Sequence, residues 1–442
     1  MSSDTTIDND SHPLSPEEQQ RNLLLFGGCV GMQYLAAPVL YVGATHAVLL
    51  KELKASNVYA NSPESIFMAC TVVPVIVAAL LPGVRWLKPL MVLSYFFAAV
   101  GTGLVALSVG LNLPGRIVGL AVLLQSVMTG LTIPLAITLV WEAMGRGVAE
   151  SRRGAALALA YGGGPILAAI GSLGAQILLN GEILTWKLGT PLAFPGNYAV
   201  VFLAAVFPML MASWLASRFV IPTVTDQNSK SQFSLLAGAR DFLSDRLLLR
   251  IAIITVLLYA GNMIIGNLAN YTQDAMGRDP KTLVMYGGVL RYGTKACAGL
   301  MLGWLMTRGN PRAGLLATGV MFLLAPTYAL FATGFAYLAT FQIYGAGELV
   351  GVYAPNYLLA ASRPRDLRRN MAYSNLLMAP AALMGLVFGK VADFVGQRSD
   401  QATGYRASFA VCAVVMAIGL ALTLIWLPRS PVSLSEKVTP TA

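Results

Sequence analysis

The sequence predicts an all-α membrane protein, and three observations support that prediction. The chain has 442 residues, of which 56% are hydrophobic and 11% charged, whereas water-soluble domains are about 25% charged. Its apolar residues form runs of roughly 20 residues, which is the length an α-helix needs to cross a bilayer. Its basic residues lie mostly in the short loops between those runs, as they do in multi-pass membrane proteins.

Twelve apolar runs are predicted to span the membrane, six on each side of a polar segment near the midpoint that contains the sequence TDQNSKSQ. We therefore predict a disordered tail over residues 1–21, a six-helix bundle over 22–217, a central loop over 218–248, a second six-helix bundle over 249–428 and a tail over 429–442. The spans themselves are 23–48, 63–82, 89–111, 117–143, 154–179, 197–217, 249–271, 282–306, 313–332, 336–361, 371–394 and 407–428.

The distribution of charge predicts the orientation. Most of the 30 Lys and Arg residues fall in loops on the same side as the N-terminus, and cytoplasmic loops are the ones that hold Lys and Arg. We expect a multi-pass protein of the cell (inner) membrane with both termini in the cytoplasm. Because no loop interleaves aromatic with basic residues, the net charge of +10 does not indicate a nucleic-acid partner.

No pattern of a catalytic or cofactor site occurs in the sequence. It has no phosphate-binding GxxxxGK[ST] loop, no zinc-ligand spacing and no nucleophile elbow, and its four cysteines lie singly inside apolar runs. We expect no enzyme activity, no metal and no cofactor. The two halves also repeat one order of residues, since Arg153, Pro165 and Gly174 recur at the same spacing as Arg368, Pro380 and Gly389.

Three charged residues lie deep inside apolar runs. Glu348 is near the middle of the tenth run, and Arg291 and Lys295 share one face of the eighth. A charge in the membrane costs roughly 2.5–3.5 kcal/mol on insertion scales, so we expect these side chains to face a common aqueous cavity; the alternative is an ion pair that only joins two helices. Two cations against one acid favour an anionic solute, whereas a Glu348 that alternates between two protonation states would carry a coupling proton.

The layout resembles the major facilitator superfamily over roughly residues 21–430. The family signature Gly-x-x-x-Asp-Arg-x-Gly-Arg-Arg is matched after the eighth run by Gly303 and Arg308, with Arg312 near the terminal basic pair and Thr307 in place of the acid. After the second run Arg85 remains from a first copy, and Asp393 belongs to a partial copy after the eleventh. Gly164 and Pro165 resemble the glycine–proline motif of the antiporter branch, although Ala168 and Ala169 replace its closing glycines.

This resemblance implies a fold of two six-helix bundles related by pseudo-two-fold symmetry. It also implies a monomeric secondary active transporter that moves a small organic solute by alternating access, coupled to protons or another ion. The alternative is a sensor or assembly factor that kept the fold without transporting. The resemblance places a central cavity on the first, fourth, seventh and tenth helices, and gating roles at Gly303, Arg308, Arg312, Arg85 and Asp393. Candidate polar residues for the cavity are Gln33, Tyr34, Gln125, Asn262 and Asn356.

Overall fold

The structure is a computed structural model. It describes residues 14–81, 84–148, 152, 155–156, 158–183, 186–189, 192–222, 235–278, 280–308, 311–361, 370, 373, 378–429 and 431.

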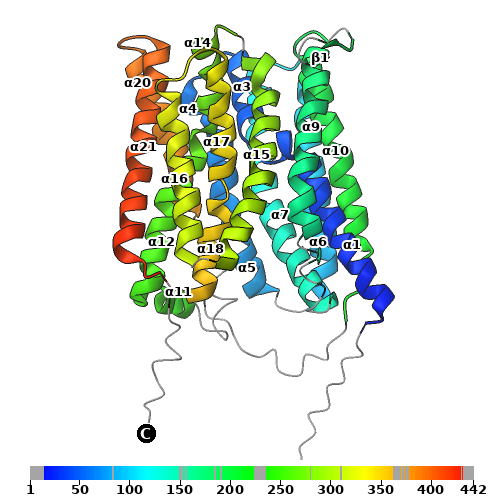
Figure 1. Ribbon diagram of the computed structural model, residues 1–442. Coiled ribbons are helices and arrows are strands. Elements are labelled where there is room, and N and C mark those ends of the chain that lie inside the picture. The colour runs from blue at the N-terminus through cyan, green and yellow to red at the C-terminus, as the bar shows by residue number, and fades with distance from the viewer. Residues whose placement is uncertain are drawn as a thin grey trace, which may run out of the picture.

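The helices of the two halves of the chain form two groups that stand side by side. Most N-terminal helices lie on the right of Figure 1 and most C-terminal helices on the left, while the N-terminal segment 57–80 lies among the C-terminal helices. α1 begins and α21 ends at the same, lower end of the molecule, as an even number of crossings requires. The N-terminal elements are α1 (Pro16–Leu35), α2 (Ala37–Leu40), α3 (Ala44–Glu52), α4 (Asn57–Ala69), η1 (Cys70–Val72), α5 (Val73–Leu80), η2 (Val84–Trp86), α6 (Leu87–Gly110), α7 (Gly115–Gly147), η3 (Ala158–Gly162), α9 (Gly163–Asn180) and α10 (Gly196–Ser217).

A two-stranded antiparallel hairpin follows α9 and consists of β1 (Glu182–Ile183) and β2 (Trp186–Lys187), with Glu182 opposite Lys187. The C-terminal elements are α11 (Leu235–Ser244), α12 (Arg246–Tyr259), η4 (Ala260–Ile264), α13 (Ile265–Asn270), α14 (Thr272–Met276), α15 (Pro280–Arg308), α16 (Pro311–Ala329), η5 (Gly334–Leu338), α17 (Ala339–Gly347), α18 (Val350–Ala361), α20 (Met378–Gly396) and α21 (Gln401–Trp426).

Each half has its own apolar core. One cluster of buried side chains draws almost entirely on residues 23–219, and the second on residues 242–427. The bundles meet where α4 packs against α20, α9 against α15, and α3 against α13. The division of the chain into two bundles, which the sequence predicted, therefore corresponds to two separate cores with an interface between them.

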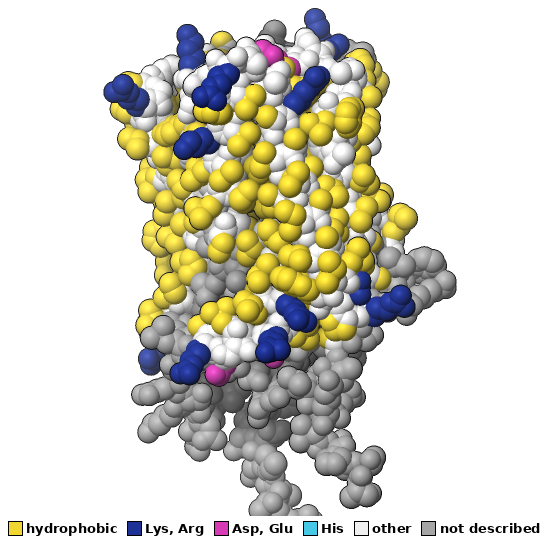
Figure 2. Space-filling model, turned by 90° about the vertical axis from the view of Figure 1, so that its left-hand side faces the viewer, with side chains coloured by type: hydrophobic (Ala, Val, Ile, Leu, Met, Phe, Trp, Pro, Cys, Tyr) yellow, Lys and Arg dark blue, Asp and Glu magenta, His cyan; other side chains and the backbone are white. Residues whose placement is uncertain are grey.

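The outer surface is that of a membrane protein. Figure 2 shows an apolar band around the middle of the molecule, with Lys and Arg side chains at both ends. Large apolar side chains on the long helices are exposed, among them Leu120 at 62%, Phe207 at 65% and Ile425 at 74%. Since such a surface is unfavourable in water and favourable in lipid, it identifies the faces that contact the bilayer.

Seven of the described helical segments are long and apolar enough to cross a membrane, compared with the twelve spans that the sequence predicts. Three further predicted spans are interrupted helices: α1 to α3 breaks at residues 41–43, α4 is joined to α5 by η1, and α17 is followed by a turn at Glu348 and Leu349. A fourth predicted span, α15, contains the charged residues Arg291 and Lys295. The fifth is the span predicted over 371–394, whose continuous helix is described only from Met378 onward. A hydropathy window averages over such breaks and charges, and so cannot locate them.

Several element boundaries differ from the predicted ones. α4 begins at Asn57, after Ser56 caps it by accepting a hydrogen bond from the Tyr59 amide at 3.2 Å, rather than at residue 63. The predicted central loop contains α11. α21 begins after Asp400, whose pKa is held below its ordinary value by hydrogen bonds from Thr403. These helix ends are polar because they are capped or face the other bundle, so an apolar pattern misses them.

Candidate functional site

The three membrane-embedded charges predicted from the sequence lie together. Arg291 Nε donates to Glu348 Oε2 at 2.7 Å, and Arg291 Nη2 donates to the other carboxylate oxygen. Lys295 Nζ lies 3.7 Å from Glu348 Oε2. The Glu348 side chain is 8% exposed, against 16% for Arg291 and 18% for Lys295. The result is a bidentate ion pair with a second cation beside it, and we call these three residues the charged cluster.

A close approach of two helices positions the cluster. A Cβ at Gly345 in α17 would overlap the backbone carbonyl of Arg291 in α15, so glycine is what lets these helices touch. α17 then ends, and Glu348 occupies its C-terminal cap position. The regular helix therefore stops at the residue whose carboxylate reaches across to α15.

Aromatic rings surround the guanidinium. The carbon Arg291 Cζ lies 5.3 Å from the centre of the Tyr292 ring and 5.1 Å from that of Tyr344, a distance that allows cation–π attraction. The Tyr344 hydroxyl donates to Asn262, whose backbone oxygen lies at 2.9 Å. Asn262 is thereby joined to the cluster through Tyr344, as a neighbour rather than as a direct partner of the charges.

The cluster lies at the interface between the bundles. Tyr292 packs with Ala37 and Ala168 of the N-terminal bundle, and Tyr34 and Tyr41 pack against the same group. A Cβ at Gly164 would overlap the Tyr34 ring, so the glycine of the GGGP sequence admits this ring against α9. A cavity of about 30 Å³, lined by Tyr41, Arg291 and the buried Ser172 among others, separates the two sides. Its volume suits one or two water molecules.

Gln33 and Gln125 are buried, and their hydrogen bonds go to partners other than the three charged residues. Gln33 donates to the Tyr95 hydroxyl and accepts from Tyr41 at 3.3 Å. Gln125 donates to the Val39 carbonyl at 3.1 Å, and its oxygen lies 3.0 Å from His46 Nε2. Both amides therefore join helices within the N-terminal bundle. The side chain of Asn356 lies outside the described residues.

Glu64 is a buried acid that the sequence analysis did not select. It lies in α4, is 7% exposed, and is close enough to Arg291 and Glu348 to interact with their charges. The predicted span starts at residue 63, so Glu64 falls at its very edge, whereas α4 begins at Asn57. Glu64 lies seven positions after the first residue of α4. With the correct helix start, the sequence would have shown an acid inside a membrane span. Among the described residues, no group of three or more His, Cys, Asp or Glu could hold a metal ion.

Comparisons with known proteins identify the fold. No family model matches the sequence, and no curated protein matches it significantly. Solved structures do match: the nucleoside transporter NupG (TM-score 0.63, 14% identity, 91% of this chain and 98% of that one) and the D-xylose–proton symporter (0.64, 13%, 93% and 98%). A third is FucP, described as a major facilitator superfamily transporter in the outward conformation (0.59, 15%, 91% and 98%).

The chain has the major facilitator fold. The resemblance inferred from the loop motifs and the six-plus-six layout is thus confirmed at the level of fold. Identities of 13–15% carry no information about which residues bind a solute in this chain.

The residues that the major facilitator signature predicts to act in gating differ from one another in their contacts. Arg312 donates to the carbonyls of Leu424 and Leu427, both at 2.8 Å, and so caps the end of α21. Arg85 is exposed, and its guanidinium lies 5.5 Å from the Trp86 ring centre. Gly303 and Arg308 fall in the last part of α15, where the side chains lie outside the described residues.

Asp393 joins the two bundles at the end of the major facilitator fold opposite the termini. Its carboxylate accepts from the backbone amides of Asn57 and Val58, both at 3.1 Å, and from Asn57 Nδ2 at 2.7 Å. The Tyr405 hydroxyl donates to Asn57 Oδ1 at 2.9 Å. A carboxylate from α20 thereby caps the positive N-terminal end of α4. We call these four residues the distal contact.

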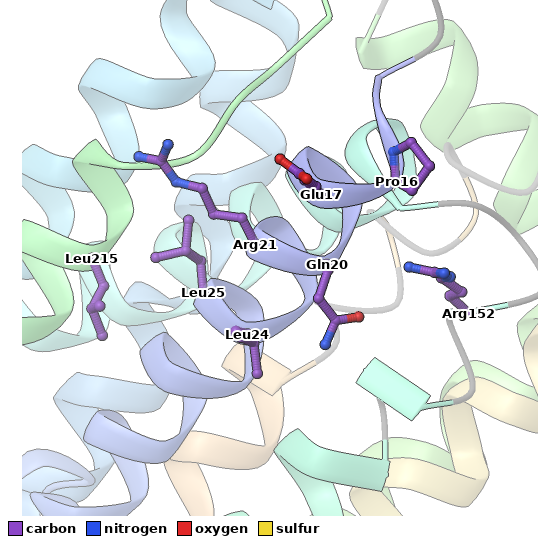
Figure 3. A pocket seen from close by; sticks show the side chains of 8 residues that line it. All are labelled: Pro16, Glu17, Gln20, Arg21, Leu24, Leu25, Arg152 and Leu215. Carbon is purple, nitrogen blue, oxygen red and sulfur yellow. The ribbon is translucent and has the colours of Figure 1, made fainter.

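A large groove of about 680 Å³ lies at the lower end of the fold, beside the start of α1 (Figure 3). Arg21, Glu17 and Arg152 stand around it, with Leu24 and Leu215 forming apolar parts of its wall. All of its lining residues belong to the N-terminal half. It is therefore separate from the interface that holds the charged cluster, and we do not include it in the candidate site.

Proposed function

We propose that this protein is a secondary active transporter that moves a small organic solute across the membrane by alternating access. The observation that carries the proposal is the charged cluster of Arg291, Glu348 and Lys295 at the interface between the bundles. Buried charges are costly in a membrane and typically mark solute or ion pathways. In transporters built from repeats, such sites lie where the repeats meet.

The cluster supports a solute with an acidic group. Two cations face one carboxylate, so the three side chains carry a net positive charge that an anionic group would neutralise. Arg291 offers a planar set of donors suited to a carboxylate or phosphate, and it lines the cavity between the bundles. Tyr34 and Tyr292 supply apolar surface with polar tips beside it. Gln33, Gln125 and Asn262 support the site from its surroundings.

The transporter is proposed to lie in the cell (inner) membrane as a monomer with both termini in the cytoplasm. The excess of Lys and Arg in the loops on the terminal side supports this orientation. The distal contact then lies on the external face, and its hydrogen bonds between α4 and α20 would close that face. Outward opening requires them to break.

Solute counterflow in proteoliposomes tests the proposal. Purified protein is reconstituted into vesicles preloaded with an unlabelled solute, and uptake of the radiolabelled form is followed. The panel comprises nucleosides, monosaccharides, dipeptides, monocarboxylates and dicarboxylates. We expect counterflow for at least one acidic compound, and its loss in Glu348→Gln and in Arg291→Met. If no compound exchanges, a non-transporting sensor or assembly factor becomes the better assignment.

A further inference from the structure

Glu64 is a buried carboxylate that has no direct partner in the charged cluster. Its side chain is 7% exposed, and its carboxyl carbon lies 3.9 Å from the place that a Cβ on Gly43 would take, at the break between α2 and α3. Among the described residues it makes no hydrogen bond and no ion pair. Burial and the lack of a direct partner favour the neutral form of a carboxylic acid.

Glu348 has the opposite surroundings. It accepts two hydrogen bonds from Arg291 and has Lys295 nearby. Opposite charges and hydrogen bonds to the charged form keep a carboxylate ionised. The two buried acids of this interface therefore have different surroundings: Glu348 is paired with cations, and Glu64 has no direct partner.

We infer that Glu64 is the site of the coupling proton, and that its protonation admits an anionic group to Arg291. This inference rests on the proposed function. It assigns proton binding to Glu64 and solute binding to Arg291. The step is a simple proton transfer: a Glu64 oxygen takes a proton from water in the pathway open on one side and returns it to water on the other.

The charges show why proton and anion would bind together. With Glu64 ionised, its charge and that of Glu348 balance those of Arg291 and Lys295. With Glu64 protonated, one positive charge is left over. In a medium of low dielectric constant, such an excess charge strongly favours binding of one anion. Proton binding and anion binding thus stabilise each other, which is the requirement for symport.

The cavity beside Arg291, which has room for one or two water molecules, offers polar partners for an anionic group. The Ser172 hydroxyl is fully buried, lines this cavity and has no hydrogen-bond partner among the described residues. Thr45 and Ala44, in the first turn of α3, line it too, and the amides at a helix N-terminus favour negative charge. An unpaired donor, a helix start and a guanidinium therefore converge on one small space.

The other titratable groups around Glu64 leave this assignment intact. Tyr344 in α17 is the remaining group that interacts with its charge. On the helices packed against α4, His46 is bound to Gln125, and Asp393 is bound to Asn57 at the distal end. Lys51 lies at the end of α3 near Asp393, and Lys390 is exposed. None of them is a direct partner of Glu64 among the described contacts.

Infrared difference spectroscopy of the full-length protein in lipid nanodiscs tests the proton site without any solute. Spectra recorded at neutral and alkaline pH report the carbonyl stretch of a neutral carboxylic acid. We expect this band in the wild type, its loss in Glu64→Gln and its retention in Glu142→Gln, which removes a carboxylate that pairs with Arg146 instead. Glu64→Asp should keep a shifted band. A band that survives in Glu64→Gln, or that disappears in Glu142→Gln, would overturn the assignment.

Transport provides the second test, with the solute that gives counterflow. Glu64→Gln mimics the protonated form, so we expect it to retain counterflow but to lose accumulation driven by a proton gradient. Glu142→Gln removes a carboxylate that pairs with Arg146 at the end of α7 and is the matched control, which should accumulate solute normally. Proton-driven accumulation by Glu64→Gln at the wild-type level would refute the inference.

These outcomes separate the inference from the proposed function. Absence of counterflow in the wild type argues against transport, whereas the infrared result still decides whether Glu64 holds a proton. Size-exclusion profiles and thermal midpoints of each variant establish that it folds. If Glu64→Gln is unstable, Glu64→Asp carries the test, and its accumulation should show a shifted dependence on pH.

Discussion

Arg291 and Glu348 form a bidentate ion pair between α15 and the end of α17, with the Nε–Oε2 distance at 2.7 Å. Both side chains are mostly buried. Removing one member of such a pair leaves an uncompensated charge, which typically costs about 3–5 kcal/mol. We therefore predict that Glu348→Gln lowers the free energy of unfolding by about that amount and abolishes transport. Thermal unfolding in detergent measures the first effect, and counterflow the second.

Replacing both members by apolar residues separates stability from function. In Arg291→Met/Glu348→Leu neither charge of the pair remains, and buried pairs replaced in this way are often no less stable. Lys295 loses its acidic neighbour but is 18% exposed, so the recovery should be partial. We expect the double variant to recover part of the stability that Glu348→Gln loses, but none of its transport. A double variant less stable than both single variants would show that the pair contributes more than mutual neutralisation.

Gly345 is predicted to be required for the approach of α17 to α15. Gly345→Ala would force the helices apart at the Arg291 carbonyl and so displace Glu348, at an overpacking cost of about 1–3 kcal/mol. Gly293 lies in α15, close in sequence to Arg291, and an added Cβ there has nothing within 4 Å. Gly293→Ala is therefore the matched control and should behave like the wild type. Counterflow and thermal midpoints measure both variants, and equal behaviour of the two would contradict the packing argument.

The distal contact is predicted to hold the external face closed. Asp393→Ala removes three hydrogen bonds to a charged group, each worth about 1.5–3 kcal/mol, and should favour external opening by roughly tenfold or more. The assay is labelling of Ala47→Cys, a position 2% exposed, by a membrane-impermeant thiol reagent in a background without native cysteines. Lys390→Ala, which alters an exposed neighbour in α20, should leave the labelling rate unchanged. Equal rates in all three proteins would refute a closing role for Asp393.

Gln125 is predicted to matter for stability rather than for solute binding. Gln125→Leu leaves His46 and the Val39 carbonyl without their partner, and a buried polar group left unpaired costs about 1–3 kcal/mol. We expect a lower thermal midpoint with an unchanged solute affinity in the correctly folded fraction. A loss of affinity at normal stability would instead return Gln125 to the transport site.

The fold and the charged cluster could be predicted from the sequence because both have strong one-dimensional signals. Twelve apolar runs around a polar midpoint indicate two bundles. The four-residue spacing of Arg291 and Lys295 puts them on one helix face, and Glu348 is the acid within reach in an otherwise apolar run. Charges in a membrane need partners or water, and the sequence left both open: it favoured a shared aqueous cavity, and the contacts show the ion pair that was the alternative.

The remaining site residues depend on contacts that no local pattern contains. Asp393 caps α4 through backbone amides more than 300 positions away in the chain. Gln33 and Gln125 are polar and at mid-span, but only the packing of their helices decides which partners their amides bond. Glu64 was missed because the polar start of α4 faces the other bundle and not lipid, which placed the helix boundary several residues late.

A reversible cross-link between the bundles tests alternating access most directly. A Cβ on Gly385 in α20 would lie 3.7 Å from the Cβ of Ser65 in α4, a separation suited to a disulfide. We predict that oxidised Ser65→Cys/Gly385→Cys, in a background without native cysteines, shows no counterflow and that reduction restores it, while Ser65→Cys alone is unaffected by oxidation. Undiminished counterflow through fully cross-linked protein would contradict transport by separation of the two bundles.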